Sequence, residues 1–425
     1  MTALSEPTVG LSSRTRPLDE APDLLAALGP DGFAWLHDGA GLATAGVAAR
    51  VRVRRGPGRL ADAAADVARL LGAIADDDPL RLPGSGPIAV GALGFSDDAD
   101  VELIVPAVVV GCTRQGQAWM TTTGSTTMPG PATGGSEHGR PVVAAAEAGA
   151  GEPTRFVVDG HGHRVHWTFA VEEALARIAS GSLSKVVLAR QVTVEADRDF
   201  GLSTIVDRLR TAHPSCFTFA AGGLVGASPE LLVRRRDTLV VSRPMAGTVG
   251  RGDTMADDNR RMAKMRSSSK EGREHRVVVD AVRKALGSVC EEVSASAQPE
   301  VARLATVAHL ATTVAGRLRP PPPTAVALAG LLHPTPAVAG EPRPAALAAI
   351  AELEEFDRGG YAGPVGWVDS RGDGDFAVAL RCARLDGRRA RLFAGAGIVA
   401  GSSAGAEWAE TQAKLEPMMR ALVQP

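Results

Sequence analysis

The chain has 425 residues, of which 45% are hydrophobic and 22% are charged. This composition is typical of a globular protein, and the length allows one large domain or two ordinary ones around a sizeable core. The formal net charge is only −2, so no bulk field favours nucleic acid or an anionic membrane as a partner. A local basic pocket for a small anionic substrate is compatible with this charge.

The cysteines and the N-terminus indicate the compartment. Four cysteines stand far apart and form no CxxC pair: Cys112, Cys216, Cys290 and Cys382. Reduced thiols are therefore expected instead of a disulfide framework or a zinc ribbon. No positive segment followed by an apolar run opens the chain, and no apolar stretch approaches the roughly 20 residues that span a bilayer. We expect a soluble, cytoplasmic protein with neither a membrane nor a nucleic acid as partner.

The first part of the chain mixes short strands with one helix. Residues 1–20 are polar, and we expect them to be loose. Segments 34–45 and 87–95 are predicted as strands, and residues 58–74 place apolar side chains at helical spacing. Residues 128–155 are rich in Gly, Pro and Ala, which predicts a flexible linker or a long surface loop.

The rest of the chain alternates helices with strands. The predicted elements are a helix at 167–182 that ends at Gly181, a strand at 184–196, two or three strands at 216–243 with turns at Gly222-Gly223 and Arg236-Asp237, a long helix at 259–285, a proline-rich loop at 319–326, strands at 364–370, 375–387 and 389–401, and a last helix at 406–422. Consecutive prolines exclude a helix or a central strand from the loop. Because hairpin-like turns join many strands, the pattern favours a mostly antiparallel α+β fold over a doubly wound parallel one.

Two pairs of glutamates suggest a metal site. They are Glu271 with Glu274, and Glu407 with Glu410. Side chains three apart share one face of a helix, so two helices could jointly hold a hard divalent cation such as Mg²⁺. Glu352 and Glu355 have the same spacing, so the spacing alone is not specific and a solvated helix face explains it equally well.

Two further motifs resemble ligand sites but fit them badly. HGHRVH brings together His161, His163 and His166, yet it follows the predicted linker and lacks a partner set, so we expect a surface turn. GAGIVAG, residues 395–401, has the spacing GxGxxxG instead of the GxGxxG of a dinucleotide loop, and too little chain follows it. We interpret GAGIVAG as a tight backbone turn that a ligand approaches closely.

Nine segments, which occur in a fixed order along the chain, strengthen the case that these weak patterns belong to one site. They are SKVVLAR (184–190), GASPELLV (226–233), RPMAGT (243–248), KEGREH (270–275), VAHLAT (307–312), HPTPAVAGEP (333–342), GYAGPVGW (360–367), ALRCARL (379–385) and FAGAGIVAGSSAGAEWAETQAK (393–414). Together they resemble the motifs of the chorismate-utilising enzymes, a family that includes isochorismate, salicylate, anthranilate and aminodeoxychorismate synthases. The resemblance covers roughly residues 160 to 420, and the first 150 residues match only loosely.

The resemblance implies a fold and a division of the chain. The family's fold is α+β, with two antiparallel β-sheets that form a sandwich core flanked by helices and with the active site in a cleft. Residues 1–155 would be a variable N-terminal part of this fold. Residues 156–425 would be the chorismate-binding catalytic region.

The resemblance also assigns the glutamates. Glu274 and Glu410 match the direct Mg²⁺ ligands, and Glu271 and Glu407 match residues that support the ion directly or through water. The ion would bind the ring carboxylate of chorismate, in keeping with the preference of Mg²⁺ for a few carboxylates plus substrate oxygens. KEGREH has Gly272 where the family usually has arginine, but the spacing of the carboxylates survives.

Two residues narrow the chemistry within the family. Aminodeoxychorismate synthases carry a lysine before the Gly-Thr of PxxGT, where this chain has Ala246, which argues against covalent amination. Isochorismate and salicylate synthases carry a lysine where this chain has Lys185. That lysine must be neutral to take a proton from water attacking C2, and burial or a nearby cation can lower its pKa. An ordinary lysine at the start of a strand is the alternative.

Glu230, in GASPE, matches the family's general acid. It would protonate the departing C4 hydroxyl and therefore needs a raised pKa. Gly247 and Thr248 match the pocket wall beside it. Tyr361, the single tyrosine of the chain, falls on a substrate-contacting position.

Other matched positions face the carboxylates of the substrate. Arg381, Lys414 and the turn at Gly395 match carboxylate-binding positions, and a guanidinium can grip a carboxylate through two parallel bonds. His309 matches a histidine near the ring carboxylate. A core histidine bonded to backbone is the alternative for His309.

The implied activity is Mg²⁺-dependent conversion of chorismate to isochorismate by an isomerase. Ala337 supports this branch because salicylate and anthranilate synthases tend to have threonine there. Salicylate synthesis, ammonia-dependent amination and a non-catalytic chorismate-binding protein remain open. We expect a monomer without an obligate glutaminase subunit, whose product could enter menaquinone or siderophore biosynthesis.

Overall fold

The computed structural model of the chain describes residues 10–29, 32–125, 152–160 and 164–423. Most of the predicted linker, residues 128–151, lies outside the described residues, as do residues 1–9 of the predicted loose segment. His161 and His163 also lie outside them. The division of the chain at residue 155 stays a prediction.

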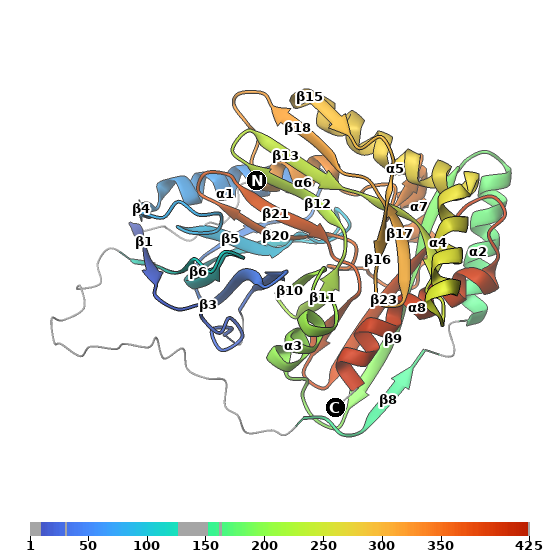
Figure 1. Cartoon of the computed structure of the whole chain (residues 1–425), viewed down its shortest axis with the longest axis horizontal. Coiled ribbons are helices and arrows are strands. Elements are labelled where there is room, and N and C mark those ends of the chain that lie inside the picture. Colours follow the sequence, from blue (N-terminus) through green and yellow to red (C-terminus); the bar gives the residue numbers. More distant parts are fainter. Residues whose placement is uncertain (1–9, 30–31, 126–151, 161–163, 424–425) are drawn as a thin grey trace.

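The described strands and helices follow in chain order (Figure 1). The strands up to residue 196 are β1 (Leu11–Leu18), β2 (Ala34–His37), β3 (Ala40–Val53), β4 (Ala75–Asp77), β5 (Ile88–Ala92), β6 (Val101–Cys112), β7 (Ala118–Ser125), β8 (Phe156–Asp159) and β9 (Lys185–Ala196). The middle strands are β10 (Phe217–Ala221), β11 (Leu224–Ser228), β12 (Leu231–Arg236), β13 (Leu239–Arg243), β14 (Met245–Gly250), β15 (Cys290–Ala295), β16 (Glu300–Arg303), β17 (Val307–Ala311) and β18 (Val314–Leu318). The last strands are β19 (Gly340–Glu341), β20 (Pro364–Asp369), β21 (Gly374–Val378), β22 (Cys382–Asp386) and β23 (Arg389–Ile398). The helices are α1 (Arg59–Ala73), α2 (Arg164–Ala179), α3 (Leu202–Ala212), α4 (Met255–Ser267), α5 (Ser269–Gly287), α6 (Ala325–Leu332), α7 (Arg343–Leu353) and α8 (Ala404–Val423).

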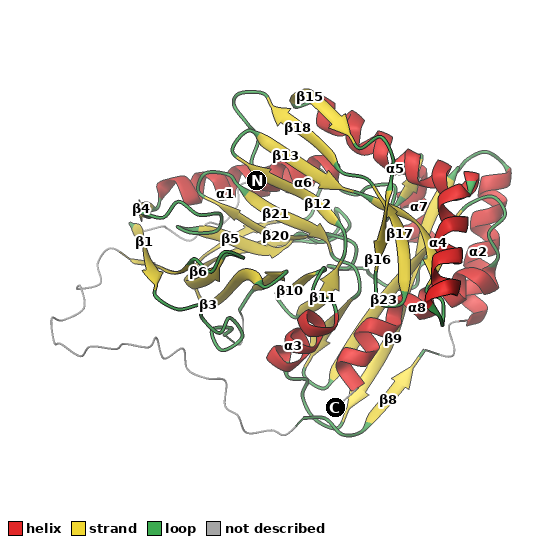
Figure 2. Cartoon of the chain, in the orientation of Figure 1, coloured by secondary structure: helices red, strands yellow, loops and turns green. Residues whose placement is uncertain are grey.

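The strands pair almost entirely antiparallel, which confirms the predicted α+β class. One arm of a 20-stranded sheet runs β9–β23–β22–β11–β10–β2–β3–β6, and a second runs β6–β5–β20–β21–β12–β13–β18–β15. A separate sheet contains β14, β17 and β16. Helices surround the strands (Figure 2). This pairing shows one large and one small sheet, so the two-sheet sandwich stays a prediction.

The prediction that residues 1–20 are loose is wrong for Leu11–Leu18. These residues form β1, which pairs with β7 over eight residues. Polar side chains fill its inner face: Thr15 and Thr121 lie buried with their hydroxyl oxygens 2.8 Å apart. Hydroxyl pairs replace the apolar alternation that marks a half-buried strand, so the polarity of the segment hid the strand.

The predicted single helix at 259–285 is two helices. Ser268 has extended backbone (φ −72°, ψ 118°) and separates α4 from α5. Its hydroxyl accepts a hydrogen bond from the backbone N–H of Glu271, as an N-cap does. The serine run 267–269 favours this local bond over a continuous helix, and the break fixes where Glu271 points.

Two other helices begin earlier than predicted. Helix α6 begins at Ala325, inside the predicted loop, because the Thr324 hydroxyl caps it by accepting from the N–H of Ala327. His166 lies in α2 and not in a surface turn. Its ring bonds the carbonyl of Leu353 at 2.8 Å and lies 3.1 Å from Glu355, so tertiary partners extend the helix across this residue.

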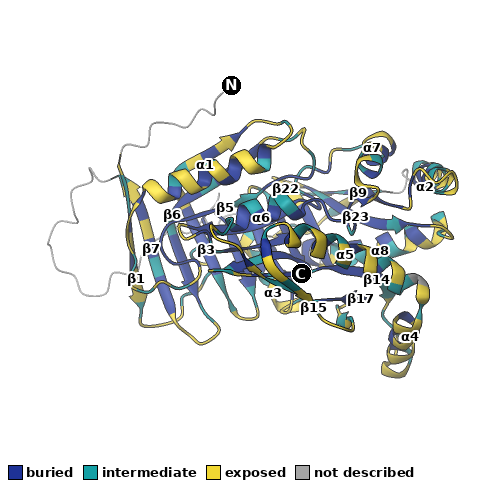
Figure 3. Ribbon diagram, turned by 90° about the horizontal axis from the view of Figure 1, so that it is seen from above, coloured by how far each residue is buried: buried dark blue, intermediate teal, exposed yellow. Residues whose placement is uncertain are grey.

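The core lies between the sheet and the helices that cover it. Helix α8 packs on β23, α5 packs on β14 and α1 packs on α6. Figure 3 shows the strands mostly buried, while α1 exposes one of its sides. In the part of the chain that the structure describes, no helix is long and apolar enough to cross a membrane.

Candidate active site

One small pocket brings together all the predicted site residues. It has a volume of about 110 Å³. The fourteen predicted residues that line it are Lys185, Glu230, Gly247, Thr248, Glu271, Glu274, His309, Ala337, Tyr361, Arg381, Gly395, Glu407, Glu410 and Lys414. They come from β9, β14, β17, β23, α5, α8 and the connections near β12, β19, β20 and β22. Motifs that are far apart in the chain therefore line one pocket of the folded protein.

The four glutamates come from two helices that face this pocket. Glu271 lies in the first turn of α5, and its Oε2 accepts a hydrogen bond from the backbone N–H of Thr248 at 3.2 Å. Glu407 lies buried in the first turn of α8, one turn before Glu410. Among the described residues, no three His, Cys, Asp or Glu side chains already form a metal cage. Mg²⁺ usually needs only one or two carboxylates beside water and substrate oxygens, so the donor set fits this ion.

Lys414 bridges one of these glutamates to the opposite strand. Its Nζ lies 2.6 Å from Oε1 of Glu410, four residues earlier on α8, and donates to the carbonyl of Gly395 at 2.9 Å. The ammonium group is therefore held between α8 and β23. A cation that binds Glu410 must share this carboxylate with Lys414.

Lys185 is the first residue of β9 and is 7% exposed. Burial lowers the pKa of Lys185; Glu274 opposes this shift and Lys414 adds to it. Gly397 makes room for the side chain: a Cβ at position 397 would lie 3.0 Å from the Cε of Lys185. Lys185 is thus a buried amine whose surroundings favour its neutral form.

Glu230 lies in the turn between β11 and β12 and is 3% exposed. Burial raises the pKa of Glu230 to about 7, against a hydrogen bond from the backbone N–H of Met245. The turn is fixed on both sides: the carbonyl of Glu230 accepts from the N–H of Val378 at 3.1 Å, and its N–H donates to Oγ of Ser228 at 3.3 Å. Near neutral pH this carboxyl group can donate a proton.

His309 is neutral and holds Arg381. Arg381 donates from Nη2 to Nε2 of His309 at 3.1 Å, because a guanidinium has no acceptor. The proton of the ring therefore sits on Nδ1, which lies 3.1 Å from the carbonyl of Gly247 and donates to it. Burial lowers the pKa of His309 well below its ordinary value. His309 lines the pocket and bonds to backbone, and its place near the ring carboxylate of a substrate stays a prediction.

Two glycines allow backbone to approach other groups. Gly247 has φ +76°, and a Cβ there would lie 2.9 Å from Oε2 of Glu271. At Gly395 a Cβ would lie 3.0 Å from the hydroxyl of Tyr361. The predicted turn at Gly395 is wrong, because Gly395 and Gly397 belong to strand β23 and the left-handed backbone occurs at Gly401, with φ +89°.

Several lining residues were not predicted from sequence. They are Val187, Pro229, Met245, Val338, Leu380 and Gly397. Most are apolar neighbours of a predicted residue. Val187 could have been found because it stands two positions after Lys185 and so shares one face of the strand.

Comparison with known proteins places the chain in a family. A profile described as chorismate binding enzyme matches residues 27–423. The chain is 43% identical over 263 residues to isochorismate synthase DhbC of Bacillus subtilis, which covers 59% of this chain and 66% of that protein. It is 39% identical over 254 residues to isochorismate synthase EntC of Escherichia coli, covering 59% and 65%. The matches span slightly less than two thirds of the length of these relatives.

A solved structure extends the similarity to almost the whole fold. The menaquinone-specific isochorismate synthase MenF of Escherichia coli superposes with a TM-score of 0.77 at 26% identity and covers 98% of this chain and 95% of the other. The profile match includes all the residues that line the pocket. The chain belongs to the family of chorismate binding enzymes.

Proposed function

We propose that the protein is a Mg²⁺-dependent isochorismate synthase, an isomerase that converts chorismate to isochorismate. Family membership and relatives named isochorismate synthases at 43% and 39% identity support this activity. The observation that carries the mechanism is the pairing of a buried amine with a buried carboxyl group in one pocket. Each has its pKa shifted toward the form that the reaction needs.

Lys185 and Glu230 would transfer the two protons. Neutral Lys185 accepts a proton from the water whose oxygen bonds to C2 of the ring. The ring double bonds shift, the C4–oxygen bond breaks, and Glu230 donates its proton so that the hydroxyl leaves as water. One water enters and one leaves, so the product is an isomer of the substrate, and solvent returns both groups to their starting protonation states.

Charged groups around the pocket would hold the substrate. Arg381 and Lys414 are suited to its two carboxylates, with Arg381 oriented by His309. Glu274 and Glu410 would hold Mg²⁺, with support from Glu271 and Glu407. When bound, the ion supplies positive charge for the ring carboxylate. These contacts fix the ring between base and acid, which supplies much of the rate gain by orientation.

Two small residues favour water addition over the other reactions of the family. Ala246 lines the pocket where an aminating relative would carry a lysine nucleophile. Ala337 lines it where salicylate synthases tend to carry threonine. We propose that isochorismate is released without elimination of pyruvate.

The proposal also covers the location and oligomeric state of the protein, its independence of a glutaminase subunit, and the packing of its large sheet. The protein would act in the cytoplasm as a monomer. It would need no glutaminase subunit, because its nucleophile is water and not ammonia. The two arms of the large sheet would pack as the family's sandwich. Two measurements test the subunit composition. The purified chain should form product without any added subunit, and it should have the molecular weight of one copy in solution.

One incubation tests the function. Purified protein is mixed with chorismate and Mg²⁺, and the products are separated by chromatography and identified by mass. One product isomeric with chorismate is expected. Salicylate with pyruvate would indicate a salicylate synthase, and anthranilate formed with excess ammonium would indicate an aminating enzyme. Chorismate-dependent thermal stabilisation without turnover would indicate a binding protein.

A further inference from the structure

A buried ion pair stands behind the wall of the active site. Arg358 donates from Nε to Oε2 of Glu354 at 2.9 Å and from Nη2 to Oε1 at 2.6 Å. Both side chains are 3% exposed. Neither residue lines the small pocket, and none of the nine family-like segments contains them.

The pair also binds backbone groups of that wall. Arg358 donates from Nη1 to the carbonyl of Val338 and from Nη2 to the carbonyl of Val187, both at 2.8 Å. Oε1 of Glu354 accepts from the N–H of Ala189 at 2.7 Å. Val187 and Val338 line the small pocket. Lys185 stands two residues before Val187, and Ala337 directly precedes Val338.

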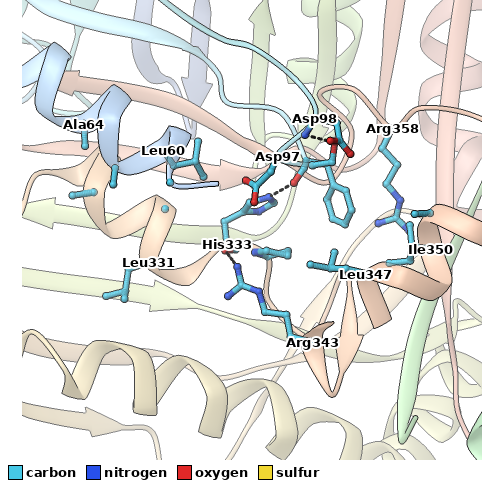
Figure 4. Close-up of a pocket in the computed structure, with 18 of the residues that line it drawn as sticks. Leu60, Ala64, Asp97, Asp98, Leu331, His333, Arg343, Leu347, Ile350 and Arg358 are labelled. Atoms are coloured by element: carbon cyan, nitrogen blue, oxygen red, sulfur yellow. Dashed lines mark hydrogen bonds between the residues drawn. The ribbon is translucent and has the colours of Figure 1, made fainter. Parts of the chain in front are cut away.

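The guanidinium of Arg358 also fills space between aromatic rings. It lies 4.3 Å from the ring centre of Phe95 and 5.8 Å from that of Tyr361, a pocket residue. On its other side Arg358 borders a larger cavity of about 1360 Å³. Figure 4 shows Arg358 at the Ile350 end of this cavity, away from Leu60 and Ala64. The pair therefore separates the two cavities.

We propose that Arg358, held by Glu354, is a positioning residue that fixes Lys185 and Ala337 relative to the substrate. This inference rests on the proposed function. The carbonyls of Val187 and Val338 belong to segments about 150 residues apart in the chain, and one planar guanidinium joins them in a fixed geometry. A lysine offers no such fork, so its substitution loosens the wall while keeping a positive charge beside Glu354.

The kinetic test compares Arg358→Lys with Arg358→Met and the wild type. The loss of kcat is expected to be about 100-fold in Arg358→Lys, since small misplacements of reacting groups have effects of this size. Arg358→Met should lose more, so that lysine gives partial rescue. The half-saturating Mg²⁺ concentration should not change, because the hydrogen bonds of Arg358 go to Glu354 and to backbone carbonyls and not to the four glutamates predicted to hold the ion.

A matched control separates positioning from stability. Leu331 lines the far side of the larger cavity (Figure 4). Leu331→Ala should keep the kcat of the wild type even where its melting temperature falls. Arg358→Lys with the kcat and KM of the wild type, and only a lower melting temperature, overturns the proposal.

A double variant covers the case in which Arg358→Met does not fold. Glu354→Gln with Arg358→Met removes both charges and leaves none buried alone. A folded double variant with low kcat supports positioning, and one with the kcat of the wild type contradicts it. The product of the wild type is identified first. Wild type that forms no isochorismate refutes the proposed function, whereas the ratio of kcat values tests Arg358 for whichever product forms.

Discussion

Two cavities in the described part of the chain differ in size and in chemistry. The larger, about 1360 Å³, lies between α1, α6 and α7, and its wall combines many alanine, leucine and proline residues with charged residues at one end, among them Asp97 and Arg358. The smaller, about 110 Å³, is walled by glutamates, lysines, an arginine and a histidine. The fourteen predicted site residues all line the smaller one. Volume therefore does not locate the chemistry in this molecule.

The treatment of charge explains the difference. At the larger cavity, Asp97 pairs with Arg59 at 3.5 Å and Glu355 pairs with His166 at 3.1 Å. In the smaller pocket, Lys185 and Glu230 are buried with their pKa values moved toward the neutral forms. Burying such groups costs free energy, and a fold retains them where a reaction uses them. Substitutions at the two cavities should consequently have very different effects.

The largest effect is expected for Lys185→Ala. Removing the amine should lower kcat by at least about 100-fold, the usual contribution of a general base. Chorismate and Mg²⁺ should still bind, as measured by calorimetry, because the carboxylates and Arg381 remain. Lys284→Ala, at an exposed position of α5, is the matched control. A Lys185→Ala protein with a tenth or more of the wild-type kcat would refute the assignment of the base.

The next largest effect is expected for Glu230→Gln, which should lower kcat by about 100-fold. The wild type needs protonated Glu230, so its rate should fall as the pH rises through about 7, the pKa of this carboxyl group. It also needs neutral Lys185, so the rate should fall at low pH. Glutamine cannot ionise, and the residual rate of the variant should therefore lose the fall near pH 7. If the pH–rate profile of Glu230→Gln still fell near pH 7, this fall would have to come from another group.

Glu274→Gln should act on the metal dependence. The half-saturating Mg²⁺ concentration is expected to rise by about 10-fold or more, because one negative ligand becomes a neutral amide. Glu352→Gln is the matched control: Glu352, in the last turn of α7, has the same spacing from Glu355 but pairs with Arg177 at 2.7 Å outside the pocket. Equal Mg²⁺ titrations for wild type and Glu274→Gln would contradict a metal site at α5.

The residues that line the pocket were easier to predict from sequence than Arg358, which holds the pocket wall from behind. Lys185, Glu230 and the glutamates stand in motifs whose order along the chain resembles a family, so their convergence could be expected. Helices and strands with regular periodicity, such as α1 and β9, were also predicted near their true bounds. Arg358 stands in none of these motifs. Its spacing from Glu354 is compatible with an ion pair, but its bonds to the carbonyls of Val187 and Val338 leave no trace in residue type.

Local competition explains the other failures. Ser268 broke a predicted helix because its hydroxyl bonds the N–H of Glu271. β1 escaped prediction because its buried face carries hydroxyl groups. Gly395 suggested a turn, yet glycine serves there to admit the hydroxyl of Tyr361 beside a strand. In each case a partner distant in the sequence, or a single side-chain bond, outweighed the pattern of the segment.

Gly397→Ala tests whether the smaller pocket tolerates even one methyl group. The new Cβ would lie 3.0 Å from Cε and 3.5 Å from Nζ of Lys185, so the amine must move. We expect kcat to fall by about 10-fold, since the shift is small. Gly405→Ala is the control, because a methyl group at position 405 would have no neighbouring group within 4 Å and alanine favours the helix α8. Steady-state kinetics of both variants measure this effect. An unchanged kcat for Gly397→Ala would show that the side chain of Lys185 has free space around it.

The smallest effect is expected at the larger cavity. Ala65 is an exposed residue of α1 that lines it. Ala65→Leu adds apolar volume at an exposed position that does not line the smaller pocket, so kcat should equal that of the wild type and the free energy of unfolding should change by no more than about 0.5 kcal/mol. Kinetics and denaturant unfolding measure both quantities. A large loss of kcat would mean that the two cavities are coupled, and the Arg358–Glu354 pair, which borders the larger cavity and bonds backbone of the smaller one, offers a route for this coupling.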